Sequence, residues 1–131
     1  MNVEILMALR LLLAAALGAI VGYQRERAGK PAGLRTHTLI CIGAALFTIA
    51  SLYGFGGADP ARIAAGIVTG IGFLGAGAII RTREHIVGLT TAASIWAVAA
   101  IGLAAGAGLY LTSVVTTAVI LIILFLPHPI R

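Results

Sequence analysis

The sequence predicts an all-α integral membrane protein with five transmembrane helices, its N-terminus outside the cell and its C-terminus in the cytoplasm. Of its 131 residues, 60% are hydrophobic and only 10% are charged, whereas about 25% of a typical soluble domain is charged. Its apolar runs approach the ~20 residues that a helix needs to cross a bilayer, and basic residues collect in alternate loops. So few charged side chains cannot cover a soluble fold, and the length excludes a multidomain enzyme.

The whole chain is interpreted as one transmembrane domain, with spans expected at residues 3–23, 37–55, 60–80, 89–105 and 109–126. A polar loop, 24–35, follows the first span. The second span ends at the glycine-rich segment 54–57, a helix breaker, and the third begins at Pro60, which suits a first helical turn. Residues 89–126 carry no charge. As one helix they would measure about 57 Å, so the turn at 106–108 is expected to divide them into two spans.

The basic residues set the predicted orientation. Nine Lys and Arg against four Asp and Glu give a formal net charge of +5. Most of the basic residues lie in the first loop, the third loop and the C-terminus: Arg25, Arg27, Lys30, Arg35, Arg81, Arg83 and Arg131. Because cytoplasmic loops collect Lys and Arg, an outside N-terminus places all of them in the cytoplasm. The expected environment is the lipid bilayer of the inner (plasma) membrane, and nucleic acid is not an expected partner.

Glycines four residues apart recur in the spans. The helix-packing candidates are Gly18, Gly22, Gly66, Gly70, Gly75, Gly102 and Gly106. Small residues at this spacing let helix backbones approach closely in lipid. Close packing within one bundle, a homodimer seam and a distorted helix that lines a site are all consistent with the pattern.

Arg10 is the most unusual residue of the first span. A span that began after it would keep only about 13 apolar residues, too few to cross. We therefore expect Arg10 inside the membrane, where an arginine costs about 2.5–3.5 kcal/mol. Its side chain either extends to the outer surface, pairs with Asp59 or lines a polar cavity.

Asp59 is equally suited to cap the third helix. Trp96 is expected to be buried in the fourth span.

A second polar group stands where spans two and four begin. Thr36, Thr90 and Thr91 lie at these helix starts, and His37 belongs to the same candidate site. The basic residues nearby are Arg25, Arg27, Arg35, Arg81 and Arg83. Helix N-termini carry unpaired N–H groups and a partial positive charge, so the two starts could together hold an anion or a partner. Ordinary helix capping and topology-setting charge explain the same residues.

The absence of recognisable catalytic and ligand-binding motifs limits the functions that the sequence can support. The sequence shows no Ser-His-Asp arrangement, no metal-ligand cluster and no nucleotide-binding motif, so we expect no enzyme activity, no catalytic residue, no cofactor and no bound metal. Its four acids, Glu4, Glu26, Asp59 and Glu84, fall at the ends of the spans. Mg²⁺ needs oxygen ligands and loses its water reluctantly. One protomer therefore offers no evident magnesium pathway.

Several stretches together resemble the membrane domain of the MgtC/SapB family. They are RLLLAAALGAIVG at 10–22, RER at 25–27, AGLRTH at 32–37, DPARIAA at 59–65, GIGFLGAG at 70–77 and GLTTAASIW at 88–96. The resemblance covers nearly all of the first hundred residues. It implies a five-span inner-membrane protein linked to growth at low magnesium and, in pathogens, to virulence inside host cells. It also implies an effect on phosphate uptake or a membrane-protein partner such as the proton-driven ATP synthase.

The resemblance also singles out residues. Asp59 matches a family acid linked to function, and the signature motifs include Glu26, Arg35, Thr36, His37, Arg62, Thr90 and Thr91. Two positions depart from the pattern, since Gln24 stands where an acid is common and Gly66 where Gln is common. Many members continue into a soluble cytoplasmic domain, and this chain is expected to be a short member without it.

These observations favour a non-enzymatic membrane protein that forms a homo-oligomer, with a dimer favoured. It would act in magnesium or phosphate homeostasis by modulating other membrane systems. The alternative is a small transporter or channel for an ion or anionic solute, which Arg10 and the helix start at Arg35 favour. A third reading is an assembly subunit in which only helix packing matters.

Overall fold

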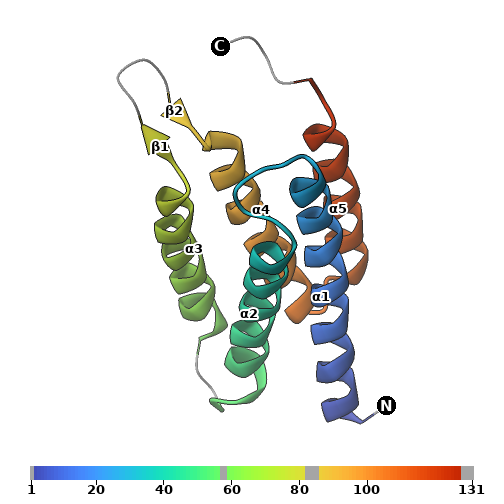
Figure 1. The fold of residues 1–131 in the computed structure, drawn as a ribbon. Helices are drawn as coiled ribbons and strands as arrows, with labels where there is room; N and C mark the ends of the chain where they lie inside the picture. Colours follow the sequence, from blue (N-terminus) through green and yellow to red (C-terminus); the bar gives the residue numbers. More distant parts are fainter. Residues whose placement is uncertain (1, 57–58, 82–85, 128–131) are drawn as a thin grey trace.

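The computed structural model describes residues 2–56, 59–81 and 86–127. These residues form five helices: α1 (Val3–Arg27), α2 (Leu34–Tyr53), α3 (Pro60–Gly77), α4 (Leu89–Gly106) and α5 (Tyr110–Leu124). Two short strands, β1 (Ile80–Arg81) and β2 (Ile86–Val87), lie between α3 and α4 in the sequence. Figure 1 shows the helices side by side, with consecutive helices running in opposite directions.

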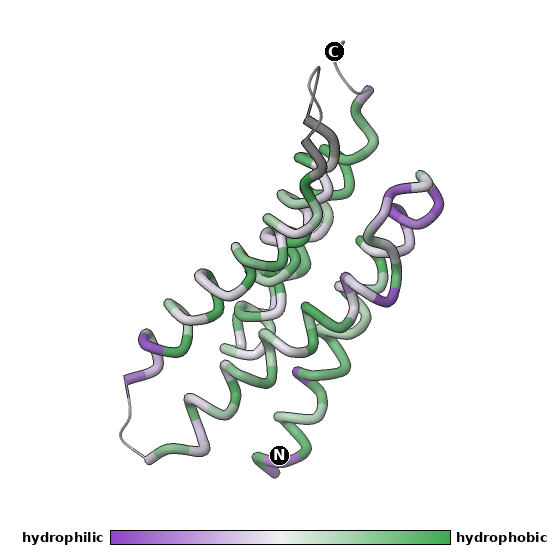
Figure 2. The backbone as a smooth tube through the Cα atoms, turned by 60° about the vertical axis from the view of Figure 1, so that its left-hand side comes forward, coloured by the Kyte–Doolittle hydropathy of each residue, from purple (hydrophilic) through white to green (hydrophobic). Residues whose placement is uncertain are grey.

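Helix lengths support the predicted membrane protein. Four helices, α1 to α4, have at least 18 residues and are apolar enough to cross a membrane. The apolar helix α5 has 15 residues, about 22 Å at 1.5 Å per residue, against a hydrocarbon core of about 30 Å. Figure 2 shows hydrophobic residues along the helices and hydrophilic residues near their ends. The prediction of five apolar helices is confirmed, and four of them have the full length of a span.

The helix bounds differ from the predicted spans by a few residues. The third helix ends at Gly77 rather than at residue 80, because the chain then pairs as an antiparallel ribbon with Ile80 opposite Val87. Such β-branched residues favour strands, and the all-α prediction overlooked this ribbon. The predicted turn between the last two helices is present. Gly108 has a φ of +89° there, a conformation that glycine adopts without steric cost.

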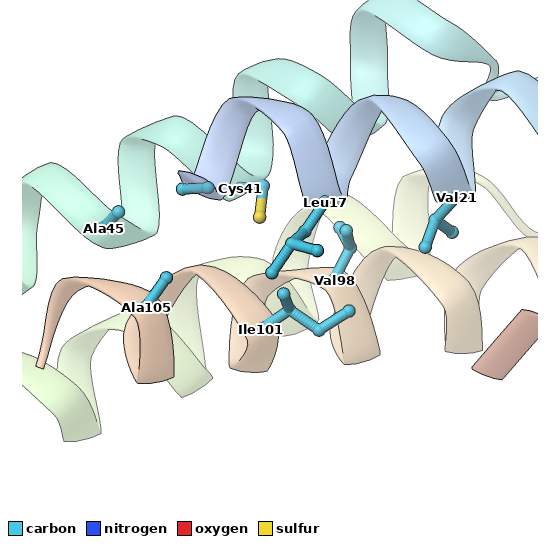
Figure 3. Packing of buried hydrophobic residues seen from close by; sticks show 8 residues of the cluster. Leu17, Val21, Cys41, Ala45, Val98, Ile101 and Ala105 are labelled. Atoms are coloured by element: carbon cyan, nitrogen blue, oxygen red, sulfur yellow. The ribbon is translucent and has the colours of Figure 1, made fainter. Parts of the chain in front are cut away.

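The core lies between α1, α2 and α4. Leu17 of α1, Cys41 of α2 and Val98 and Ile101 of α4 belong to one buried cluster, and Figure 3 shows these side chains meeting between the three helices. Trp96 is 53% exposed, so the prediction that it is buried is wrong. A helix turns by about 100° per residue, which directs Trp96 away from a core that Val98 and Ile101 enter.

Glycines hold this core together by close backbone approach. Gly18 and Gly22 of α1, and Gly102 and Gly106 of α4, all face α2. A Cβ atom added at Gly18 would lie 2.6 Å from the Cβ of Cys41, which is closer than real Cβ atoms approach. These glycines let α1 and α4 approach the backbone of α2 closely, as small residues do between membrane helices.

Helix α3 packs less closely than the others. Only Ile67 and Gly75 are buried in it, and Gly75 faces Ala92 of α4, with 3.4 Å between an added Cβ and the Ala92 carbonyl oxygen. A Cβ added at Gly66 or Gly70 would meet no described atom within 4 Å. These two glycines, which their spacing assigns to helix packing, therefore face open space in the protomer.

Candidate functional site

Four buried polar side chains gather at one end of the bundle. Figure 1 shows that α1 ends and that α2 and α4 begin at this end. The four residues are Arg25, His37, Thr91 and Ser94, which we name the Arg25 cluster. The exposed fraction is 2% for Arg25 and 0% for His37. Arg25 stands in the last turn of α1, His37 in the first turn of α2, and Thr91 and Ser94 in the first two turns of α4. Alternating helix directions bring these segments together.

Arg25 is a buried cation with a neutral partner. Its Nη2 donates a hydrogen bond to Oγ1 of Thr91 at 3.1 Å, and its Nε has no hydrogen-bond partner among the described residues. A hydrogen bond to a charged group contributes about 1.5–3 kcal/mol, whereas burying a charge costs several kcal/mol. The one hydrogen bond to Thr91 therefore offsets only part of the cost of burying Arg25. An ionisable residue within a membrane bundle is a candidate functional residue by default.

His37 connects α2 to α4 through hydrogen bonds. Its Nδ1 lies 3.0 Å from the carbonyl oxygen of Gly33, and its Nε2 lies 2.8 Å from Oγ of Ser94. Because the carbonyl only accepts, Nδ1 carries a proton. In a neutral imidazole Ser94 donates to Nε2. In a protonated imidazole Nε2 donates instead, and Ser94 donates to the Thr91 carbonyl oxygen at 2.8 Å. The cluster can thus hold one proton more or less in the same heavy-atom arrangement.

Glu26 organises the loop before this cluster. Its side chain is exposed, and its Oε1 accepts a hydrogen bond from the backbone N–H of Leu34 at 3.1 Å. Leu34 is the first residue of α2, whose leading N–H groups have no partner within the helix. A Cβ added at Gly33 would lie 2.6 Å from Oε1 of Glu26, so glycine permits the contact. Glu26 therefore acts as a cap for α2.

The polar group predicted at the helix starts divides into two sets. One set meets in the Arg25 cluster: Arg25, His37 and Thr91. The other set is exposed: Arg35, Thr36 and Thr90. Sequence reasoning does not single out Ser94. The signal that could find it is its spacing, because it lies three residues after Thr91 and so on the same face of α4.

Arg10 forms side-chain hydrogen bonds at the opposite end of the bundle. It is 8% exposed. Its Nε donates to Oη of Tyr110 at 2.8 Å, and its Nη1 donates to Oη of Tyr53 at 3.0 Å and to the Gly106 carbonyl oxygen at 3.1 Å. We name Arg10, Tyr53 and Tyr110 the Arg10 cluster. The side chain reaches toward helix ends rather than toward Asp59, and tyrosines at such ends are typical of membrane interfaces. Sequence reasoning did not include either tyrosine.

Asp59 and Arg62 lie at the start of α3, and both are exposed. The Asp59 side chain accepts a hydrogen bond from the backbone N–H of Ala61 at 3.0 Å, which makes it the N-cap of α3. Arg62 borders an apolar groove of about 590 Å³ between α2 and α3. This α2–α3 groove is also lined by Gly66 and Gly70.

Replacement of Asp59 by alanine is expected to lower the free energy of unfolding by about 0.5–2 kcal/mol, because α3 loses its cap. Asp59→Asn keeps a capping oxygen and is expected to stay close to the wild type. Thermal unfolding of the purified protein in detergent measures both variants. Equal stability of the alanine and asparagine variants would contradict the capping role. Loss of function in Asp59→Asn at unchanged stability would assign a separate role to the negative charge.

Comparison of the sequence with known proteins identifies its relatives. A family model described as the MgtC family matches residues 11–131. The chain is 48% identical over 128 residues to "Putative magnesium transporter YhiD" of Escherichia coli (strain K12), covering 92% of this chain and 60% of that protein. It is 44% identical over 114 residues to protein MgtC of Brucella abortus (strain 2308), covering 87% of this chain and 48% of that protein.

A further relative is protein SrpB of Synechococcus elongatus, which is 42% identical over 122 residues, covering 82% of this chain and 67% of SrpB. The chain thus spans between 48% and 67% of the length of these three relatives. No solved structure matches it.

Proposed function

The chain belongs to the MgtC family, and from this premise we propose that it is a non-enzymatic protein of the inner (plasma) membrane that serves magnesium and phosphate homeostasis. In this proposal it modulates other membrane systems, with a membrane protein such as ATP synthase as its partner, and does not conduct Mg²⁺ itself. The name of the Escherichia coli relative links that protein to magnesium transport, which makes magnesium the first ion to test.

One observation carries the proposal: the two ends of the bundle each hold a buried arginine. Arg10 and Arg25 are 8% and 2% exposed, and the buried cluster between them is apolar, with Ala14, Leu17 and Val21 contributed by α1. A path for Mg²⁺ needs oxygen ligands to replace its water. Two buried positive charges along the same helix repel a cation, so this interior favours a role other than magnesium conduction.

The proposed orientation follows from the charges at one end. Arg27, Lys30 and Arg35 are exposed around the end that holds the Arg25 cluster. Because basic residues collect on the cytoplasmic side of a membrane, this end is assigned to the cytoplasm and the Arg10 end to the outside. The buried Arg25 cluster then lies beneath a cytoplasmic surface whose exposed basic residues a cytoplasmic signal, or the cytoplasmic face of a membrane partner, can reach.

Growth at low magnesium tests the proposed function. A bacterial strain without its own MgtC-family proteins is grown with and without the chain, in limiting and in ample Mg²⁺. We expect the chain to restore growth in limiting Mg²⁺ and to leave growth in ample Mg²⁺ unchanged. Absence of rescue, while the protein is present in the membrane fraction, would contradict the proposal.

A second candidate function is transport of an anionic solute, which the two buried arginines favour. Uptake of labelled phosphate into proteoliposomes separates this function from the first. Transport through the bundle predicts uptake above that of empty vesicles, and a loss of about tenfold or more in Arg10→Gln and Arg25→Gln. The exposed Arg35 provides a control, because Arg35→Gln removes the same charge outside the buried clusters. Uptake equal to that of empty vesicles would reject this function.

We also propose that two copies pair through α3. Gly66 and Gly70 lie four residues apart on an open face of this helix, and small residues at this spacing are where membrane helices associate. A twofold axis along the membrane normal brings identical surfaces together. It would set Asp59 of one copy beside Arg62 of the second copy, because both residues stand at the start of α3. The paired charges and the open glycine face therefore favour a second copy as the occupant of the α2–α3 groove.

Gly70→Leu is expected to convert this dimer into a monomer, because a leucine fills the groove and keeps the two backbones apart. Ala65→Leu is the matched control, since Ala65 is exposed on α3 and does not line the groove. Sedimentation of the purified protein in detergent gives the mass of each species. A monomeric wild type would contradict the pairing, and so would a dimer that survives Gly70→Leu. In either case the α2–α3 groove would be filled by lipid or by another protein.

A further inference from the structure

We propose that the Arg10 cluster binds a phosphate-type oxyanion, supplied either by a phospholipid headgroup or by free inorganic phosphate. The proposal concerns the end of the bundle opposite the Arg25 cluster and does not depend on the proposed function. Three helix segments meet there: α1 contributes Arg10, Tyr53 is the last residue of α2, and Tyr110 is the first residue of α5. Hydrogen bonds from Arg10 to both tyrosine hydroxyls join them.

The hydrogen bonds of this cluster leave several donors without an acceptor. A guanidinium has five N–H donors. Its Nε and Nη1 bind Tyr110, Tyr53 and the Gly106 carbonyl oxygen, whereas Nη2 has no hydrogen bond within residues 2–56, 59–81 and 86–127. Each tyrosine hydroxyl accepts from Arg10, so its own proton points away from the guanidinium. Two N–H groups of Nη2 and two O–H groups are therefore available around one positive charge.

Charge also favours an anion here. The Arg10 side chain is 8% exposed, and its hydrogen bonds in the described part of the chain go to hydroxyl and carbonyl oxygens rather than to a carboxylate. The carboxylate of Asp59 caps α3 instead. A buried charge is stable when it is paired and hydrogen-bonded, and the planar guanidinium matches the geometry of a phosphate group. A phosphate oxyanion would supply both the missing charge and the acceptors for the free donors.

The cluster is open to a ligand from the bundle end. Tyr53 and Tyr110 are 45% and 42% exposed. Gly108 packs beside Nη2, and an added Cβ would stand 2.9 Å from this nitrogen, so a side chain at this position would displace the guanidinium. Arg10 is seven residues from the start of α1, about 10 Å along the helix. Helix α1 has 25 residues, about 37 Å, so it extends past a hydrocarbon core of about 30 Å by only a few Å at each end. The backbone of Arg10 therefore lies inside the core, and its side chain extends to Tyr53 and Tyr110 at the helix ends, toward the interface.

Thermal unfolding of delipidated protein in detergent tests the proposal with two probes. The first is inorganic phosphate, compared with chloride at the same ionic strength. The second is phosphatidylglycerol, compared with diacylglycerol of the same acyl chains, which lacks the phosphate. We expect a rise in the unfolding temperature with at least one phosphate probe and none with its matched control. A response to inorganic phosphate identifies a free oxyanion, and a response to phosphatidylglycerol alone identifies a lipid headgroup.

The double variant Tyr53→Phe/Tyr110→Phe removes the two O–H groups and keeps the rings, whose centroids lie 5.6 and 5.7 Å from the Arg10 guanidinium carbon. It should raise the half-saturating probe concentration by about tenfold or more, the effect of losing one to two hydrogen bonds. Tyr23→Phe, at the other end of α1, should leave it unchanged. The single variants replace the double variant if it cannot be purified. No response of the wild type to either phosphate probe, or equal binding by wild type and variants, would overturn the proposal.

Discussion

Replacement of Gly102 by alanine is expected to separate α4 from α2 and to lower the free energy of unfolding by about 3 kcal/mol or more, at the upper end of what overpacking costs. A Cβ at this position would collide with the carbonyl oxygen of Cys41 and would lie 3.1 Å from the Cβ of Ala44. A backbone carbonyl cannot rotate away as a side chain can. The helices must therefore move apart, and the core cluster that contains Cys41, Val98 and Ile101 opens.

Gly43→Ala provides the matched control, because an added Cβ at Gly43 of α2 meets no described atom within 4 Å. The same substitution there should leave the stability unchanged or raise it by up to about 1 kcal/mol, since alanine is the better helix former. The two alanine variants thus differ in the sign of their effect. Thermal unfolding of both in the same detergent measures it, and equal stabilities would show that α4 and α2 do not pack as described.

Removal of the buried charge by Arg25→Gln is expected to abolish the rescue of growth at low magnesium and to leave the amount of protein in the membrane unchanged. The physical reason is that Arg25 is a buried charge with few partners, since its Nη2 binds a neutral hydroxyl and its Nε has no described partner. Glutamine removes a charge that is costly to bury without a charged partner, so we expect the variant to fold. Loss of function without loss of protein would therefore identify Arg25 as a functional residue.

Arg35→Gln is the control for this experiment. It removes one positive charge from the same end of the bundle, but the Arg35 side chain is exposed. If the basic residues only set the orientation of the chain, the two glutamine variants should behave alike. We expect Arg35→Gln to grow as the wild type does. Equal growth of both variants would show that the Arg25 cluster serves only to orient the chain in the membrane and to pack the helices.

Much of the fold could be predicted from the sequence because bilayer thickness imposes a length on each apolar run. The helix α1, the turn at Gly108 and the cap at Asp59 all follow from local patterns of residues. The ribbon that pairs Ile80 with Val87 was not predicted. A two-residue strand is too short for a periodic pattern to reveal.

The sites were less predictable, because their contacts join distant parts of the chain. Arg10 was recognised as unusual, yet Tyr110, which binds it, lies 100 positions away. Ser94 is 57 positions from His37, and the residues around it in the sequence do not distinguish it from other small residues of an apolar helix. Spacing also gave Gly66 and Gly102 the same role, although only Gly102 meets another helix in the protomer. Periodicity identifies the face of a helix, whereas the neighbour of that face depends on how the helices pack.

Magnesium flux in proteoliposomes tests most directly the central claim that this MgtC-family protein serves ion homeostasis without conducting Mg²⁺. Purified protein is reconstituted, Mg²⁺ is added outside, and an indicator inside the vesicles reports its entry. We expect entry no faster than in protein-free vesicles, although the same protein restores growth in cells. Saturable entry of Mg²⁺ that depends on the protein and is abolished by Asp59→Asn would contradict it and establish a transporter.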